Sequence, residues 1–273
     1  MTGGCAATEK QGRDAIAVSF EPQAWLASRI AGDDFDIVTL LPPGSDPEVY
    51  QPSVSTMKNI ADATVYFTLH TPGFEQNLVE NISDNFPDLK IVDSASEVAK
   101  IHDSHGNINS SDANADNFDP HILASVRNCI AIARTMMESL SSIYPERASD
   151  FKKSGEQLIS QLQELDDSIS ALDLKGKSIV IRHPSLSYFA RDYGVAQLPL
   201  SDVGKEASAL QMIQRINDSA SSHPSVMVVE MEHASSSDHD SASRLGVDTI
   251  RVALNTSSWL NDLMRLAHEI DRN

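Results

Sequence analysis

Cysteine is nearly absent from this chain of 273 residues, which contains only Cys5 and Cys129. A disulfide framework needs more cysteines than this, and a thiolate zinc site needs several of them at close spacing. A disulfide framework and a thiolate zinc site are therefore both excluded. Cys129 lies within an apolar helical run that continues through residues 130–133, so we expect it to be a small, buried hydrophobic side chain.

Basic residues and long apolar runs are also scarce. There are 21 basic residues against 39 acidic ones, which gives a formal net charge of −18. Nucleic acids and anionic lipids bind basic surfaces, so this balance argues against both as partners. The charge is compatible with attracting cations, although a solvated acidic surface is the more ordinary explanation. No run approaches the roughly 18 apolar residues of a membrane-spanning helix, and we expect no segment to cross a bilayer.

Short apolar runs alternate with helical patterns along most of the sequence. Four of these runs in the first half and four in the second indicate buried strands, at residues 15–20, 37–41, 64–67, 89–92, 178–181, 195–198, 226–229 and 249–252. Strands that alternate with helices are typical of βαβ units and a mainly parallel sheet. Four strands followed by four strands predict an α/β fold with two similar lobes.

Two helical segments separate the two sets of strands. Apolar residues recur at three- and four-residue steps after Pro120, and again after Pro145, where they run from Phe151 to Leu172. The second helix would be about 25 residues long and span about 38 Å, which makes it a stiff connector that permits little hinge opening. We therefore predict an N-terminal tether (1–14), an N-terminal lobe (15–146), a long rigid connecting helix (147–174) and a C-terminal lobe (175–273).

Two of the nine histidines lie where a bound ligand is expected. Ligands of open α/β sheets bind beyond the carboxyl ends of the strands, and His183 directly follows such a strand. His121 is predicted in the first turn of a helix, after the capping pair 119–120. Glu48 lies in a turn rich in Pro and Gly after an earlier strand. Two imidazoles and a carboxylate suit Zn²⁺, although a lone histidine at a strand end is more often structural.

Two further features are a low-complexity stretch within the N-terminal lobe and a cysteine near the N-terminus. His102 and His105 begin a stretch rich in Asp, Asn, Ser and Gly, residues 103–117, which indicates a mobile loop. These two histidines could collect a metal transiently, and a plain linker is an equally good interpretation. Small residues precede Cys5, as they do at the end of a bacterial lipoprotein signal, but the usual Leu three positions upstream is absent. We predict lipidation at Cys5, with an incidental cysteine as the alternative.

Several motifs, in order along the chain, carry a family resemblance. Residues 43–52 (Pro-Gly-Ser-Asp-Pro-Glu-Val-Tyr-Gln-Pro) resemble a Gly-x-Asp-Pro-His-x-Tyr-Glu-Pro loop. Residues 119–122 resemble an Asp-Pro-His-apolar ligand motif. The closest match is the run 183–194, His-Pro-Ser-Leu-Ser-Tyr-Phe-Ala-Arg-Asp-Tyr-Gly. Together they resemble the metal-binding, extracytoplasmic substrate-binding proteins of zinc and manganese ABC importers, over roughly residues 15–270.

The resemblance implies two (β/α)₄ lobes with parallel sheets and a metal ion in the cleft between them. It makes His121 and His183 ligands, and it places Glu48 where the family usually has His. A carboxylate oxygen binds Zn²⁺ at about 2.0–2.2 Å, so that replacement can preserve binding. The family's usual Asp after the last strand is missing, which leaves Asn255, Glu232 or water as the fourth ligand. The imidazoles favour zinc over manganese, while Glu48 makes the site harder.

The function implied by the resemblance is capture and delivery of Zn²⁺, or alternatively Mn²⁺, to an ABC permease in the membrane. The protein would be a monomeric receptor and not an enzyme. It would work in the periplasm or at the outer face of the cytoplasmic membrane, anchored through a lipid on Cys5. One alternative is a degenerate member that binds a non-metal ligand or a protein. Another is a metal-dependent hydrolase, although no nucleophile elbow, His-Glu-x-x-His helix or Gly-rich phosphate loop is present.

Overall fold

Two four-stranded parallel sheets form the framework of the structure, a computed structural model that describes residues 13–42, 45, 50–72, 74–102, 118–201, 209–231 and 234–273. The first sheet has the order β2-β1-β3-β4, from β1 (Asp14–Val18), β2 (Phe35–Thr39), β3 (Val65–Thr68) and β4 (Lys90–Asp93). The second has the order β6-β5-β7-β8, from β5 (Ser178–Ile181), β6 (Ala196–Pro199), β7 (Val226–Glu230) and β8 (Thr249–Val252). The predicted α/β fold with two similar lobes is confirmed.

The eight predicted strands are all present, with ends that differ by a few residues. β3, β5 and β7 are buried along their whole length because helices cover both faces of each sheet, which is why their sequences are nearly continuous apolar runs. β1 ends at Val18, two residues before the predicted end. The backbone N–H groups of Ser19 and Phe20 both donate to Gln23 Oε1 (3.1 Å each), and this turns the chain out of the strand into the next helix.

Helices cover both faces of the two sheets. In the first lobe they are α1 (Glu21–Ala31), α2 (Val54–Ala61) and α3 (Phe74–Asn85), and in the second α6 (Ser187–Tyr193), α7 (Ala209–Ala220), α8 (Asp238–Leu245) and α9 (Trp259–Arg272). Between the lobes come α4 (Val126–Ile143) and α5 (Ala148–Ser170), each preceded by a 3₁₀ turn, Ile122–Ala124 and Pro145–Arg147. None of the described helices combines the length and the apolar character that a membrane span requires.

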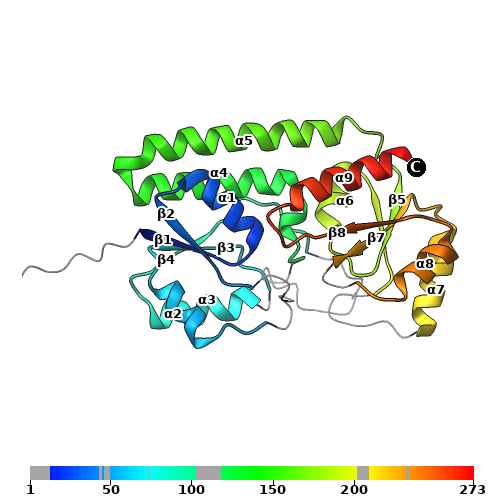
Figure 1. The fold of residues 1–273 in the computed structure, drawn as a ribbon, viewed down its shortest axis with the longest axis horizontal. Coiled ribbons are helices and arrows are strands. Elements are labelled where there is room, and N and C mark those ends of the chain that lie inside the picture. The colour runs from blue at the N-terminus through cyan, green and yellow to red at the C-terminus, as the bar shows by residue number, and fades with distance from the viewer. Residues whose placement is uncertain are drawn as a thin grey trace, which may run out of the picture.

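The long helix α5 runs along both lobes, with α4 beside it (Figure 1). It contacts α1 of the first lobe and α9 of the second. The largest apolar core is continuous from Ile16 in β1 to Ile270 in α9, and it includes the buried faces of α4 and α5. Smaller cores under α2 and α3, and under α7 and α8, complete the other faces of the sheets. Because the main core crosses the predicted boundaries, the division at residues 147 and 174 stays a prediction.

One helix start differs from the prediction. The helix expected directly after residues 119–120 begins only at Val126, where Ser125 is the N-cap and its Oγ accepts the N–H of Asn128 (3.2 Å). His121 precedes the 3₁₀ turn, and Asp119 bonds to His121 instead of capping α4. The prediction of His121 in the first helical turn was therefore wrong. Cys129 is fully buried in α4 as predicted, and burial raises the pKa of its thiol to about 12.

The contact between α4 and α5 depends on Gly155. A Cβ atom at this position would lie 2.5 Å from Met137 Sδ and 2.9 Å from Met137 Cβ, closer than real Cβ contacts. We expect Gly155→Val to lower the free energy of unfolding by about 2 kcal/mol, because overpacking forces the two helices apart. Chemical denaturation measures this. Ser160→Val, on the exposed side of the same helix, is the matched control and should change stability little. Equal effects of the two variants would contradict the proposed close contact.

Candidate metal site

Two histidines from distant parts of the chain meet at the junction of the lobes. His183 follows β5 after one intervening residue, and His121 lies just before the 3₁₀ turn that leads into α4. Their Nε2 atoms are 3.1 Å apart, and their rings are inclined at 72°. His183 is buried, while the side chain of His121 is partly exposed. The pair therefore has a buried member and a member that solvent can reach.

The separation of the two Nε2 atoms is close to what one metal ion requires. Two imidazole nitrogens at 2.0–2.1 Å from a tetrahedral Zn²⁺ lie about 3.3 Å from each other. The observed 3.1 Å is near this value. The two rings could therefore bind one ion with little movement, and the cost of organising them before binding is small.

Asp119 determines which nitrogen of His121 is available. Its Oδ1 accepts from His121 Nδ1 (2.8 Å) and from the His121 backbone N–H (2.9 Å). Burial by itself would raise the pKa of this carboxyl, but the hydrogen bonds and charge of His121 outweigh that effect and lower the pKa to about 2. Asp119 is therefore ionised at neutral pH, and the proton of a neutral His121 lies on Nδ1. This leaves the Nε2 lone pair directed at His183, as in the carboxylate–histidine–metal arrangement.

The segment that carries His183 is fixed from the other side. Arg182, the preceding residue, donates through Nε to Oδ1 of the buried Asp238 at the start of α8 (3.0 Å). The carbonyl of His183 accepts the N–H of Ser185 (2.8 Å). These bonds hold the backbone of the turn between β5 and α6 on which His183 lies.

A cavity of about 130 Å³ adjoins His121. Most of its wall is apolar, and its lining comes from the ends of the first-lobe strands, the 3₁₀ turn and the segment after β8: Phe20, Leu69, Thr71, Pro72, Phe74, Pro120, His121, Leu123, Ala124, Leu254 and Asn255. Asn255 thus shares a cavity with His121. Apolar walls lower the local dielectric constant and strengthen the attraction between an ion and its ligands.

A buried carboxylate that the sequence did not point to shapes one wall of this cavity. Glu75, in the first turn of α3, is fully buried and accepts from the backbone N–H groups of Leu69 (3.0 Å) and Thr71 (2.8 Å). The hydroxyls of Ser19 and Thr71 also donate to it. Residues 74–75 resemble the start of a helix in the family, but an acid at a helix start usually indicates no more than a favourable helix dipole, and we predicted no role for it in the site.

The structure describes only some of the other predicted site residues. Glu48, Glu232, His105 and Cys5 lie outside the described residues. His102 is described, and its ring packs edge-on against Phe118 with centroids 6.4 Å apart. Among the described residues, no three His, Cys, Asp or Glu side chains are grouped as a metal site would need. The structure therefore brings together His121 and His183, with Asn255 in the adjoining cavity, and the rest of the ligand set stays a prediction.

Comparison with known proteins places the chain in a family. The family model described as "Zinc-uptake complex component A periplasmic" matches residues 16–256. Zinc-binding protein AdcA of Streptococcus pyogenes serotype M3 is 28% identical over 214 residues, which cover 72% of this chain and 41% of that protein. Zinc-binding lipoprotein AdcA of Streptococcus pneumoniae strain R6 is 27% identical over 210 residues, which cover 73% and 41%. The chain thus spans about two fifths of the length of these relatives.

Comparison of the fold with solved structures agrees with the family match. A crystal structure of ZnuA superimposes with a TM-score of 0.83 at 24% identity, and the match covers 96% of this chain and 99% of that one. This likeness shows a shared fold. Since the family model covers most of the sequence, from β1 to the segment after β8, the chain belongs to the zinc-uptake component A (ZnuA) family of metal-binding substrate-binding proteins.

Proposed function

We propose that this protein is the substrate-binding component of a metal ABC importer, and that it captures Zn²⁺ between its lobes and delivers it to a membrane permease. The observation that carries the proposal is the histidine pair, with Nε2 atoms 3.1 Å apart and Asp119 bonded behind His121. Family membership and the zinc-binding relatives support it. Imidazole nitrogen suits Zn²⁺ better than the harder Mn²⁺, which remains the second candidate because Glu48 would add an oxygen ligand.

In this proposal His121 and His183 are the two nitrogen ligands. Glu48 and one of Asn255, Glu232 or water complete the coordination. Asn255 is favoured by its place in the cavity beside His121. Where a side chain takes the fourth position, no site is left for an attacking water, and we infer that the protein performs no reaction on its cargo. A hydrolase would need such a position, and a degenerate receptor would need no metal at all.

The proposed setting is the periplasm or the outer face of the cytoplasmic membrane, with a lipid on Cys5 as the anchor. The periplasmic family and the lipoprotein among the relatives support this setting. The proposed partner is the membrane permease, and we propose that the protein binds it as a monomer.

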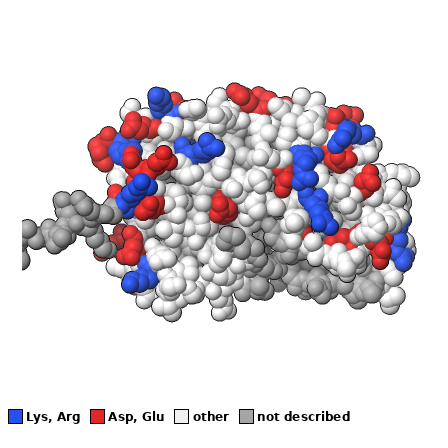
Figure 2. All heavy atoms as spheres, in the orientation of Figure 1, with Lys and Arg blue, Asp and Glu red and all other residues white. Residues whose placement is uncertain are grey.

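On the face shown in Figure 2, basic and acidic side chains lie interspersed toward the two ends, and much of the middle carries no charge. A nucleic acid would need a continuous basic surface, which this face does not offer.

Thermal unfolding of metal-stripped protein tests the proposal. Zn²⁺ at 100 times its Kd should stabilise the native state by about 2.7 kcal/mol, more than Mn²⁺ at equal concentration, and a chelator should reverse the effect. His183→Ala and His121→Ala should each abolish the zinc-dependent rise in Tm. His268→Ala, at an exposed position on α9, should retain it. A larger rise with Mn²⁺ would change the assigned cargo, and no rise with either ion would favour the degenerate receptor.

Asp119 should strengthen zinc binding through His121. Asp119→Asn keeps the size of the side chain but removes its charge, and we expect the Kd for Zn²⁺ to rise about 10–100-fold. Competition with a chromophoric chelator measures the Kd. In a His121→Ala background, whose residual affinity is measured at higher Zn²⁺ concentration, the same substitution should have little further effect, because Asp119 acts through that ring. Additive losses would show that Asp119 acts on the site by another route.

Zinc binding should weaken as the pH falls below about 6, because both imidazoles, whose ordinary pKa is about 6.5, must lose a proton to bind the ion. The Asp119 carboxyl, with a pKa of about 2, stays ionised across this range and contributes nothing to the change. Between pH 6 and 5, log Kd should therefore rise by up to about two per pH unit, as expected for two competing protons. A Kd independent of pH would rule out both histidines as ligands.

A further inference from the structure

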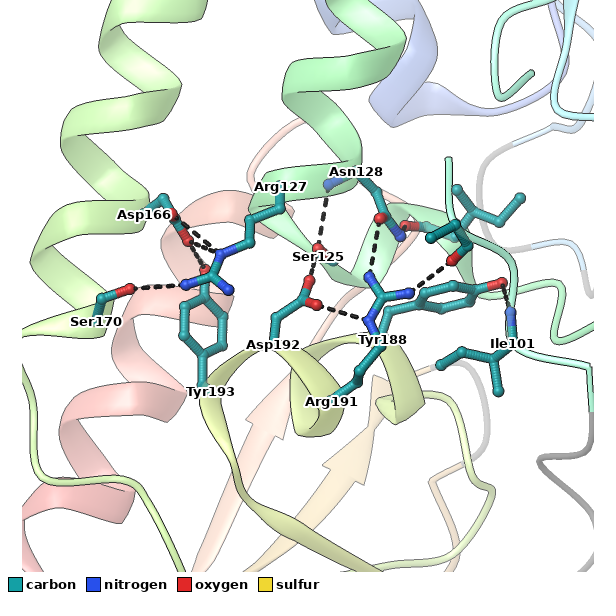
Figure 3. Close-up of polar contacts among 12 residues, drawn as sticks. Ile101, Ser125, Arg127, Asn128, Asp166, Ser170, Tyr188, Arg191, Asp192 and Tyr193 are labelled. Atoms are coloured by element: carbon teal, nitrogen blue, oxygen red, sulfur yellow. Dashed lines mark hydrogen bonds and ion pairs between the residues drawn. The ribbon is translucent and has the colours of Figure 1, made fainter. Parts of the chain in front are cut away.

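One buried hydroxyl joins the segments on which the two histidines lie. Tyr188, in the first turns of α6, is fully buried, and its hydroxyl donates to the backbone carbonyl of Asp119 (2.9 Å). The same oxygen accepts the backbone N–H of Ile101 (3.3 Å), a contact drawn in Figure 3. Both hydrogen-bonding roles of the hydroxyl are thus occupied, and burial raises its pKa to about 12, so it stays protonated and able to donate.

The three residues in this contact form a closed set of bonds. The N–H of Asp119 donates to the carbonyl of Ile101 (2.8 Å), and Tyr188 contacts both residues from the other lobe. Asp119 is therefore fixed through its N–H, its carbonyl and its carboxylate, and the carboxylate holds His121. The bond from Tyr188 comes from the chain segment that bears His183.

Further contacts hold Tyr188 and its helix in place. Arg191 lies over its ring, with Cζ 5.0 Å from the centroid, and donates to the carbonyl of Ala99 and to Asn128 Oδ1. Its neighbour Asp192 accepts the hydroxyl of Ser125, the N-cap of α4. Figure 3 shows these bonds converging on α6 from α4 and from the segment that contains Ile101. The helix that carries Tyr188 is thus anchored to the other lobe at several points.

We propose that Tyr188 is a positioning residue for metal capture, whose hydroxyl fixes Asp119, and through it His121, at the distance from His183 that one ion requires. The inference rests on the proposed function, in which the two histidines are the ligands. His183 and Tyr188 are five residues apart on one short segment, so the bond from Tyr188 to Asp119 links the two segments that carry the ligands. Without the hydroxyl, the backbone carbonyl of Asp119 loses the hydrogen bond from Tyr188, and the histidine pair becomes less well organised for a metal.

The same helix offers a matched control. Tyr193 is also buried in α6, and its hydroxyl donates to Asp166 Oδ1 on α5 (2.8 Å), beside Arg127. Figure 3 shows this contact on the α5 side of the network, away from the contact between Tyr188 and Ile101. Tyr193→Phe removes a buried hydroxyl of equal kind without touching Asp119. It therefore separates a general loss of stability from an effect on the site.

The experiment compares Tyr188→Phe and Tyr193→Phe in the full chain, with each variant shown to be folded by circular dichroism. We measure the Tm of the metal-stripped protein, the Kd for Zn²⁺, and the visible absorption of bound Co²⁺, which reports ligand geometry. Both variants should lower the Tm. Tyr188→Phe alone should raise the Kd for Zn²⁺ by about 10-fold or more and alter the Co²⁺ bands.

A second measurement keeps the test independent of any loss of stability. In combination with Asp119→Asn, Tyr188→Phe should act non-additively on the Kd for Zn²⁺, while Tyr193→Phe should act additively. An unchanged Kd and Co²⁺ spectrum in Tyr188→Phe, or equal changes in both tyrosine variants, would overturn the positioning role. If the wild-type protein bound no Zn²⁺, or if His183→Ala bound it normally, the proposed function would fall first and the role of Tyr188 with it.

Discussion

The hydrogen bond between the Asp119 carboxylate and the His121 ring is the interaction on which the site depends. A buried carboxylate is costly unless it has partners, and here the partners are the ring and the backbone of one histidine. The bond stabilises the buried charge and fixes the tautomer of His121. It also couples the charge to whatever Nε2 of the same ring binds. A metal ion at that nitrogen would meet an imidazole made more basic by the anion behind it.

The scaffold explains why such a pair can be placed so closely. The two sheets have the same strand order, and the segments that follow β1, β3 and β8 line one cavity beside His121, at the carboxyl ends of strands, where ligands of open α/β sheets bind. The β5 end supplies His183. The approach to α4 supplies His121, and α4 packs along α5, which contacts both lobes. The distance between the two rings is therefore set by packed helices and not by a flexible linker.

The sequence predicted the framework well because buried parallel strands leave a strong trace in it. All eight strands, the two lobes and the long helix could be predicted from apolar runs and their spacing. The start of α4 could not, because an Asp-Pro pair before a helix is typical of a cap. Whether Asp119 takes a helix N–H or a ring N–H depends on the fold of the neighbouring turn, where Ser125 provides the cap instead.

The site was predictable only in part for a similar reason. His121 and His183 were found from their positions in motifs, but nothing local shows that their rings meet. Tyr188 and Tyr193 illustrate the limit most clearly. They are five residues apart on one helix and both are buried, yet one contacts Asp119 and the other Asp166. Sequence patterns record that a side chain is buried, while the partner of its polar atom depends on segments far along the chain.

The apolar core that continues from β1 to α9 has a consequence for modularity. In many two-lobed proteins each lobe encloses its own core, so that lobes can be exchanged between relatives as separate units. Here α4 and α5 contribute to a core that both lobes share. A chimera that joined one lobe of this protein to the other lobe of a distant relative would have to carry over matching faces of these two helices. The two lobes, together with α4 and α5, would therefore have to be exchanged as one unit.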